Sequence, residues 1–176
     1  MKRFIFLLIG ISLCLSSCAY AIRYDGPYEG RVIDAETGKR IEGVVILGVW
    51  YKEQPTVAGA VSSYYDAKET VTDKNGEFRI EGLGLKMFSY VGMMRFMIFK
   101  AGYMHLYGPW ESLKESDYYK KMVKWEGKKV IIPLRTLTLD ERRMSSTFPH
   151  HPEAPEEKIK IMMEEIQKER KERGLD

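Results

Sequence analysis

The chain has 176 residues, enough for one domain with a sizeable core, and 12% of them are aromatic, which suits a β-rich protein. Its formal net charge is +3 at pH 7, and Lys2 and Arg3 supply two of these charges. A nearly neutral body, without a basic cluster interleaved with aromatic residues, argues against a nucleic-acid-binding protein.

The first 17 residues have the pattern of an export signal. Met1-Lys2-Arg3 is basic, and residues 4–15 are apolar apart from three positions. This run is too short to cross a bilayer, which takes roughly 20 apolar residues. The order of basic, apolar and then small residues, here Ser16 and Ser17, is typical of a cleaved signal peptide. After Cys18 no apolar run approaches spanning length.

The segment Leu15-Ser16-Ser17-Cys18 resembles the lipobox of bacterial lipoproteins. The resemblance implies a signal peptide over residues 1–17 and lipidation of Cys18. Several acyl chains would then anchor the protein firmly in a membrane, where a single chain holds only marginally. By the same resemblance, Ala19 in place of Asp implies transfer to the outer membrane of the cell envelope. The alternative is an ordinary secretory signal cut near Ala19 or Ala21, which would leave a soluble protein.

The first part of the body reads as strands and turns. Residues 18–27 are expected to form a short tether, which reaches at most roughly 30 Å when extended. The body begins at Tyr28, and residues 30–34 indicate a strand. The near-continuous apolar run 44–51 is typical of a strand that is covered on both faces. Residues 56–69 are small and polar, and they indicate a loop or an irregular edge strand.

A tight turn is the clearest local signal in the middle of the chain. Asn75-Gly76 lies between alternating residues and predicts a hairpin. In the strand that follows, Phe78 and Ile80 are expected to face the core, and Glu77 and Arg79 are expected to face water.

The second half of the body contains fewer strand signals. Residues 81–90 indicate a loop with several glycines, and residues 94–100 indicate a strand. An insertion follows, with a helical piece over residues 112–125. Residues 128–134 form the last clear strand, in which Pro133 favours a sheet edge or the end of the strand.

The tail is predicted to be a linker and a helix. A Pro-containing linker covers residues 137–155. Acidic residues in the first turn, basic residues in the last and Gly174 beyond it predict an amphipathic helix over residues 156–173. One apolar stripe follows the helical period and is formed by Ile159, Met162, Met163 and Ile166. The stripe either docks on its own domain or contacts a protein partner.

Four segments in order, residues 28–45, 70–78, 99–103 and 130–134, carry a resemblance to a known family. They contain G-x-V-x-D-x-x-T-G, T-D-x-x-G-x-F and K-x-G-Y patterns, and they resemble the carboxypeptidase regulatory-like domain. The resemblance implies an all-β fold, a transthyretin-like Greek-key β-sandwich of about seven strands, over residues 28–136. In zinc carboxypeptidases this module accompanies the catalytic domain and does no chemistry of its own.

The sequence contains no motif for catalysis. His105, His150 and His151 are the only histidines, and H-E-x-x-H does not occur. The nucleophile elbow G-x-S-x-G is also missing. We therefore predict a protein that is not an enzyme and that uses no metal and no cofactor.

Two function hypotheses follow. The first is a lipid-anchored, non-catalytic interaction or structural module of the envelope, which binds a protein partner. The second is a carbohydrate-binding lipoprotein whose exposed loop aromatics stack on sugars. The aromatic residues that would form this glycan site are Tyr103, Tyr107 and Trp110. The same side chains could instead pack the insertions against the sandwich.

Overall fold

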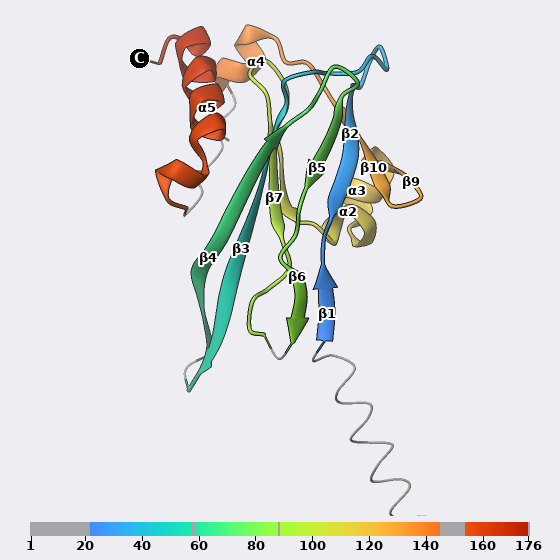
Figure 1. The fold of residues 1–176 in the computed structure, drawn as a ribbon. Coiled ribbons are helices and arrows are strands. Elements are labelled where there is room, and N and C mark those ends of the chain that lie inside the picture. The colour runs from blue at the N-terminus through green and yellow to red at the C-terminus, as the bar shows by residue number, and fades with distance from the viewer. Residues whose placement is uncertain (1–21, 58, 88, 145–153, 176) are drawn as a thin grey trace, which may run out of the picture.

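The structure is a computed structural model and describes residues 22–57, 59–87, 89–144 and 154–175. The predicted signal peptide, Cys18 and residues 145–153 of the predicted linker lie outside the described residues. Figure 1 shows two layers of strands, with the C-terminal helix lying outside one of them and a narrow ribbon at the opposite end.

Two four-stranded sheets form the body. The first sheet has the order β5 (Glu77–Ile80), β2 (Tyr28–Asp34), β10 (Lys129–Leu134) and β9 (Lys124–Glu126). The second sheet has the order β4 (Gly59–Val71), β3 (Val45–Thr56), β7 (Arg95–Phe99) and β8 (Leu106–Pro109). Strand β10 runs parallel to β2, and all other neighbours in the two sheets are antiparallel.

A third, two-stranded unit pairs β1 (Ile22–Asp25) antiparallel with β6 (Gly84–Met87), and we call it the ribbon. The predicted tether 18–27 and the predicted loop 81–90 therefore each contribute a strand. The mostly β fold agrees with the sequence prediction, although the described residues contain ten strands where about seven are expected.

The main core lies between the two sheets. Ile46 and Trp50 of β3 pack with Val32 of β2 and Ile132 of β10, and all four side chains are fully buried. Helices α2 (Ser112–Glu115) and α3 (Asp117–Met122) cover one side of this core. The helical piece predicted over residues 112–125 is therefore two short helices followed by strand β9. The break falls at Ser116, whose backbone is extended.

A second core lies on the outer face of the second sheet, under helix α5 (Lys160–Arg173). Val45, Leu47 and Val49 alternate along β3 with the residues of the main core, because successive side chains of a strand point to opposite faces. The strand predicted to be covered on both faces is thus confirmed, and the helix is its second cover.

The C-terminal helix differs slightly from its predicted span. It begins with the 3-10 turn η1 (Glu156–Lys158), and α5 starts only at Lys160. The helix ends before Gly174, as the sequence predicts, and Gly174 has the left-handed conformation at φ 74°. A further short helix, α4 (Leu139–Met144), lies within the segment predicted as a linker.

Of the two alternatives predicted for residues 56–69, a loop or an irregular edge strand, the structure has the edge strand. β4 lies at the edge of the second sheet and pairs with β3 along its whole length, with a register shift at Trp50 and Tyr51. One prediction about strands is wrong. The Asn75-Gly76 turn forms, with Gly76 at φ 70°, but the strands on either side of it belong to different sheets, so no hairpin results. The chain crosses between sheets at the buried Thr72, whose hydroxyl donates to the Ile41 carbonyl and accepts from the Val44 N–H.

The inward and outward pattern of β5 is as predicted, with Phe78 and Ile80 buried and Arg79 exposed. Pro133 lies in β10, which has a neighbour on each side. The pairing with β9 ends at Ile131, so Pro133 has a strand only on its β2 side. A residue without a backbone N–H is tolerated at such a local edge.

Candidate functional site

Helix α5 is fixed to the second sheet at both of its ends. At its N-terminus, the Glu69 carboxylate of β4 accepts hydrogen bonds from the N–H groups of Ile161 (2.8 Å) and Met162 (3.0 Å). The first N–H groups of a helix have no partner within the helix and carry a partial positive charge, so a carboxylate is favourable there. Next to this contact, Lys158 pairs with Asp66 at 3.0 Å, which raises the pKa of Lys158.

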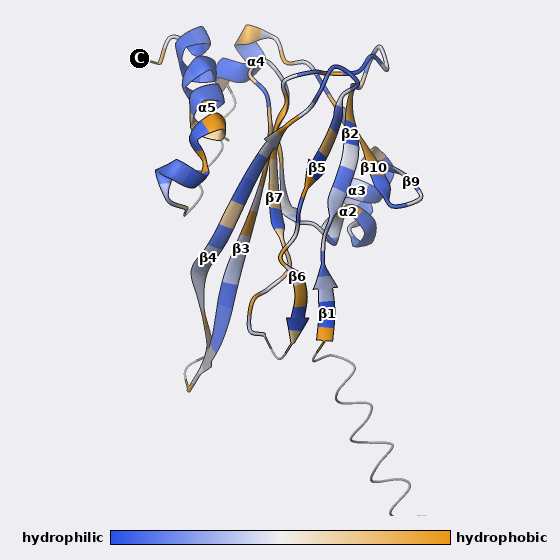
Figure 2. Ribbon diagram, in the orientation of Figure 1, coloured by the Kyte–Doolittle hydropathy of each residue, from blue (hydrophilic) through white to orange (hydrophobic). Residues whose placement is uncertain are grey.

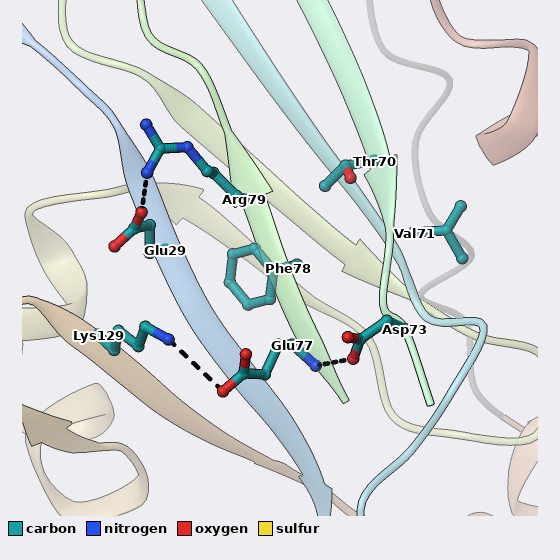
Figure 3. A pocket seen from close by; sticks show the side chains of 8 residues that line it. All are labelled: Glu29, Thr70, Val71, Asp73, Glu77, Phe78, Arg79 and Lys129. Atoms are coloured by element: carbon teal, nitrogen blue, oxygen red, sulfur yellow. Dashed lines mark hydrogen bonds and ion pairs between the residues drawn. The ribbon is translucent and has the colours of Figure 1, made fainter. Parts of the chain in front are cut away.

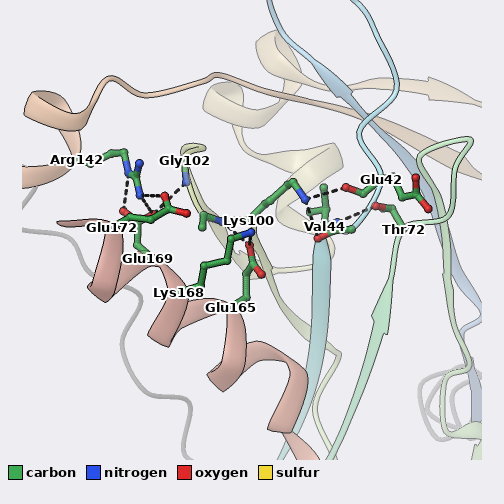
Figure 4. A network of polar contacts seen from close by, with 12 residues as sticks. Glu42, Val44, Thr72, Lys100, Gly102, Arg142, Glu165, Lys168, Glu169 and Glu172 are labelled. Atoms are coloured by element: carbon green, nitrogen blue, oxygen red, sulfur yellow. Dashed lines mark hydrogen bonds and ion pairs between the residues drawn. The ribbon is translucent and has the colours of Figure 1, made fainter. Parts of the chain in front are cut away.

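The C-terminal half of α5 is held by the charged network of Figure 4. Arg142 of α4 donates to both oxygens of the buried Glu169, at 2.9 and 2.5 Å, and also to Glu172. Glu169 also accepts from the Gly102 N–H, and Glu165 accepts from the Ala101 N–H. Both charges of the Arg142–Glu169 pair are nearly removed from water, so losing one partner would leave the other uncompensated.

These contacts hold the four residues predicted to bind a partner against the second sheet. Ile159 and Met162 are fully buried, Ile166 is nearly so, and Met163 is half-buried against the second sheet. Of the two alternatives that the sequence leaves open, the structure has the stripe docked on its own domain. The stripe therefore offers little surface to another protein while α5 stays in place.

The predicted glycan-contacting aromatics do not share one surface. Trp110 packs in an aromatic cluster at the main core, with ring centroids 5.1 Å from Tyr28 and 6.4 Å from Trp125. Tyr103 is partly buried against the same core. Tyr107 points away from that core, because Leu106 and Gly108 occupy the inward positions of β8. The carbohydrate hypothesis stays a prediction, but these three residues do not form a common platform.

A shallow pocket of about 330 Å³ lies on the charged outer face of the first sheet, at its β5 edge (Figure 3). Its ionised side chains already have partners. Glu77 pairs with Arg31 at 2.9 Å and with Lys129 at 3.5 Å, and the Arg31 hydrogen bond lowers the pKa of Glu77. Glu29 pairs with Arg79. The arrangement is a ladder of exposed ion pairs, which contributes modestly to sheet pairing.

The base of the ribbon holds a buried carboxylate. Asp25 accepts a hydrogen bond from the Tyr28 hydroxyl at 2.7 Å, from the Trp50 indole N–H at 2.9 Å and from the Leu83 N–H at 2.8 Å. Burial, helped by Asp25, raises the pKa of Tyr28 well above its usual value. Since a buried carboxylate needs such donors, this network attaches the base of the ribbon to both sheets.

The two faces of the ribbon differ sharply. Arg23 and Lys86 form one face, which is turned towards the body. The Arg23 guanidinium donates to the carbonyls of Val91 and Gly92, and the Lys86 ammonium lies 5.1 Å from the ring centre of Tyr65. The register pairs Ile22 with Met87 and Tyr24 with Leu85, which puts these four side chains on the opposite face. They are between 50% and 71% exposed.

Sequence reasoning missed this apolar face, although a signal was present. Both Ile22-Arg23-Tyr24 and Leu85-Lys86-Met87 alternate apolar and charged residues, the period of a half-buried strand. Each run is only three residues long, and the two lie about sixty positions apart. Nothing in the sequence pairs them.

Within the described ranges, no group of three or more His, Cys, Asp or Glu side chains is placed to hold a metal ion. The helices of that part of the chain all lack the length and apolar character that a membrane span requires. The chain matches no protein family, no curated protein and no solved structure.

Proposed function

We propose that this protein is a lipid-anchored, non-catalytic module of the bacterial cell envelope that binds a protein partner, with its lipid on Cys18 in the outer membrane. One observation carries the proposal. The basic, apolar and small segments end in Leu15-Ser16-Ser17-Cys18, and the first strand begins only four residues later, at Ile22. An anchor at Cys18 would therefore hold the folded body directly at the membrane surface.

The proposal includes a transthyretin-like Greek-key assignment for the sandwich and membership of the carboxypeptidase regulatory-like family. Two four-stranded sheets support it, as do connections that pass repeatedly from one sheet to the other. The Gly102 N–H of the K-x-G-Y pattern binds Glu169 of α5, so the family-like segment is also where the helix attaches.

The surface proposed for a protein partner is the distal half of β4. This strand lies at the edge of the second sheet, and β3 is its one strand neighbour in the described chain. Residues 59–65 are exposed apart from the half-buried Tyr64, and Figure 1 shows the β3–β4 hairpin projecting beyond the sandwich. An exposed edge strand offers a row of backbone donors and acceptors to an added strand.

The anchor is tested by metabolic labelling of the native host with a clickable fatty acid. The wild-type chain is expected to take up the label and to fractionate with the outer membrane, and Cys18→Ser is expected to lose the label. A labelled Cys18→Ser chain, or an unlabelled wild-type chain, would refute the anchor.

The partner surface is tested by placing a photo-crosslinking amino acid at Ser62 of β4 in the same host. The matched control carries it at Lys39, an exposed residue of the turn after β2. A discrete crosslinked protein at Ser62 that is missing at Lys39 supports the β4 surface. Identical products at both positions would count against it.

A further inference from the structure

The apolar face of the ribbon consists of Ile22, Tyr24, Leu85 and Met87, and its direction is fixed. Arg23 and Lys86 bind the body from the other face, and Asp25 holds the base of β1 in the core. The ribbon therefore cannot turn its apolar side inward without breaking these contacts. In Figure 2 the hydrophobic colour on β1 and β6 lies at the end of the molecule opposite helix α5.

The position of this face along the chain restricts what covers it. Four residues from Cys18 to Ile22 span at most about 14 Å when fully extended. A lipid on Cys18 would thus bring the ribbon within that distance of the bilayer surface.

The size and composition of the face favour lipid over protein. A stable protein interface uses roughly 20–30 residues on each side, and four side chains fall far short of that. A bilayer needs no such area when the protein is already tethered, because the tether turns a weak contact into an intramolecular one. A tyrosine together with aliphatic side chains on one face suits the membrane–water interface.

We infer that the ribbon is a second membrane contact, with Ile22, Tyr24, Leu85 and Met87 resting in the interfacial layer of the bilayer beside the lipid on Cys18. The inference rests on the proposed lipid anchor. It adds that the body is held in one orientation, ribbon towards the membrane and α5 away from it.

The test uses the lipidated protein, purified from its host in detergent and reconstituted into vesicles of phosphatidylethanolamine and phosphatidylglycerol. A nitrobenzoxadiazole probe is attached through Leu85→Cys, or through Lys39→Cys as the matched control at the far end of β2. Both side chains are exposed, so both variants are expected to fold. Mass spectrometry of the same samples establishes whether Cys18 carries its lipid.

The Leu85→Cys probe is expected to shift its emission to the blue in vesicles. It is also expected to lose emission when the vesicles contain a lipid with a spin label near the headgroup. The Lys39→Cys probe is expected to show neither change. Equal responses at both positions on an acylated chain would overturn the ribbon contact and leave the anchor standing.

Two further outcomes are informative. A blue shift at Leu85→Cys without quenching by the spin-labelled lipid would mean that protein covers the face, as in an association of two copies, and would overturn the inference. An unmodified Cys18 would overturn the anchor and the ribbon contact together.

Discussion

Two apolar surfaces of this protein have similar composition and opposite surroundings. The α5 stripe of Ile159, Met162, Met163 and Ile166 lies on the second sheet and is mostly buried, whereas the ribbon face of Ile22, Tyr24, Leu85 and Met87 is exposed. Periodicity identifies an apolar face, but it does not say what covers that face. The α5 stripe is covered by the same chain, whereas no described residue covers the ribbon face.

The largest expected effect comes from opening the covered surface. Met162→Ala removes a fully buried side chain from the core under α5, and we expect a loss of about 3 kcal/mol in the free energy of unfolding. The measurement is urea unfolding followed by tryptophan fluorescence. Ile161→Ala is the matched control, because Ile161 is the next residue of the same helix and is exposed. Equal effects of the two substitutions would contradict the docking of α5.

A smaller loss is expected at the base of the uncovered surface. Asp25→Ala leaves the Trp50 N–H, the Tyr28 hydroxyl and the Leu83 N–H without their acceptor, so we expect a destabilisation of about 2 kcal/mol. Hydrogen exchange of the β1 and β6 amides should show whether the ribbon loosens first. Asp25→Asn keeps one acceptor oxygen and should lie between Asp25→Ala and wild type. If Asp25→Ala unfolds like wild type, the network does not hold the ribbon.

Acid is expected to destabilise the first turn of helix α4, where Glu141 lies. The Arg135 side chain and the Thr138 N–H lower the pKa of Glu141 to about 2, from an ordinary 4.5. Because the folded pKa is the lower one, this carboxylate stabilises the fold above pH 4.5, and its contribution is lost as the pH falls towards 2. The free energy of unfolding, measured with urea at several pH values across this range, should fall less steeply for Glu141→Gln than for wild type. If the free energy of unfolding falls equally with pH in the two proteins, protonation of Glu141 does not affect the stability of the fold.

The smallest effect on stability is expected on the ribbon face itself. Leu85→Ser changes an exposed side chain, so we expect the free energy of unfolding to stay within about 0.5 kcal/mol of wild type. Thermal unfolding in detergent provides the measurement. A larger loss would mean that Leu85 packs against the body, and the contrast between the two apolar surfaces would then fail.

The sequence predicts local structure correctly where a short segment determines its own conformation. The apolar run in β3, the alternation in β5 and the end of the last helix before Gly174 are all present as the sequence predicts. Each depends on residues within a few positions of one another.

The larger differences concern pairing over long distances. The partner of β4 is β3 rather than β5, and β1 pairs with β6, about sixty residues further along the chain. Glu69 binds the start of a helix more than ninety residues further on. Pairing of this kind depends on which surfaces remain free after the local elements form, and no single segment contains that information.

Strand β4 also has a mechanical consequence. Its thirteen residues extend over about 40 Å, from the hairpin tip to the neighbourhood of α5. Glu69 lies near the upper end of this strand and holds the first turn of the helix. A force applied at the hairpin tip would therefore be transmitted along β4 directly to the attachment of α5.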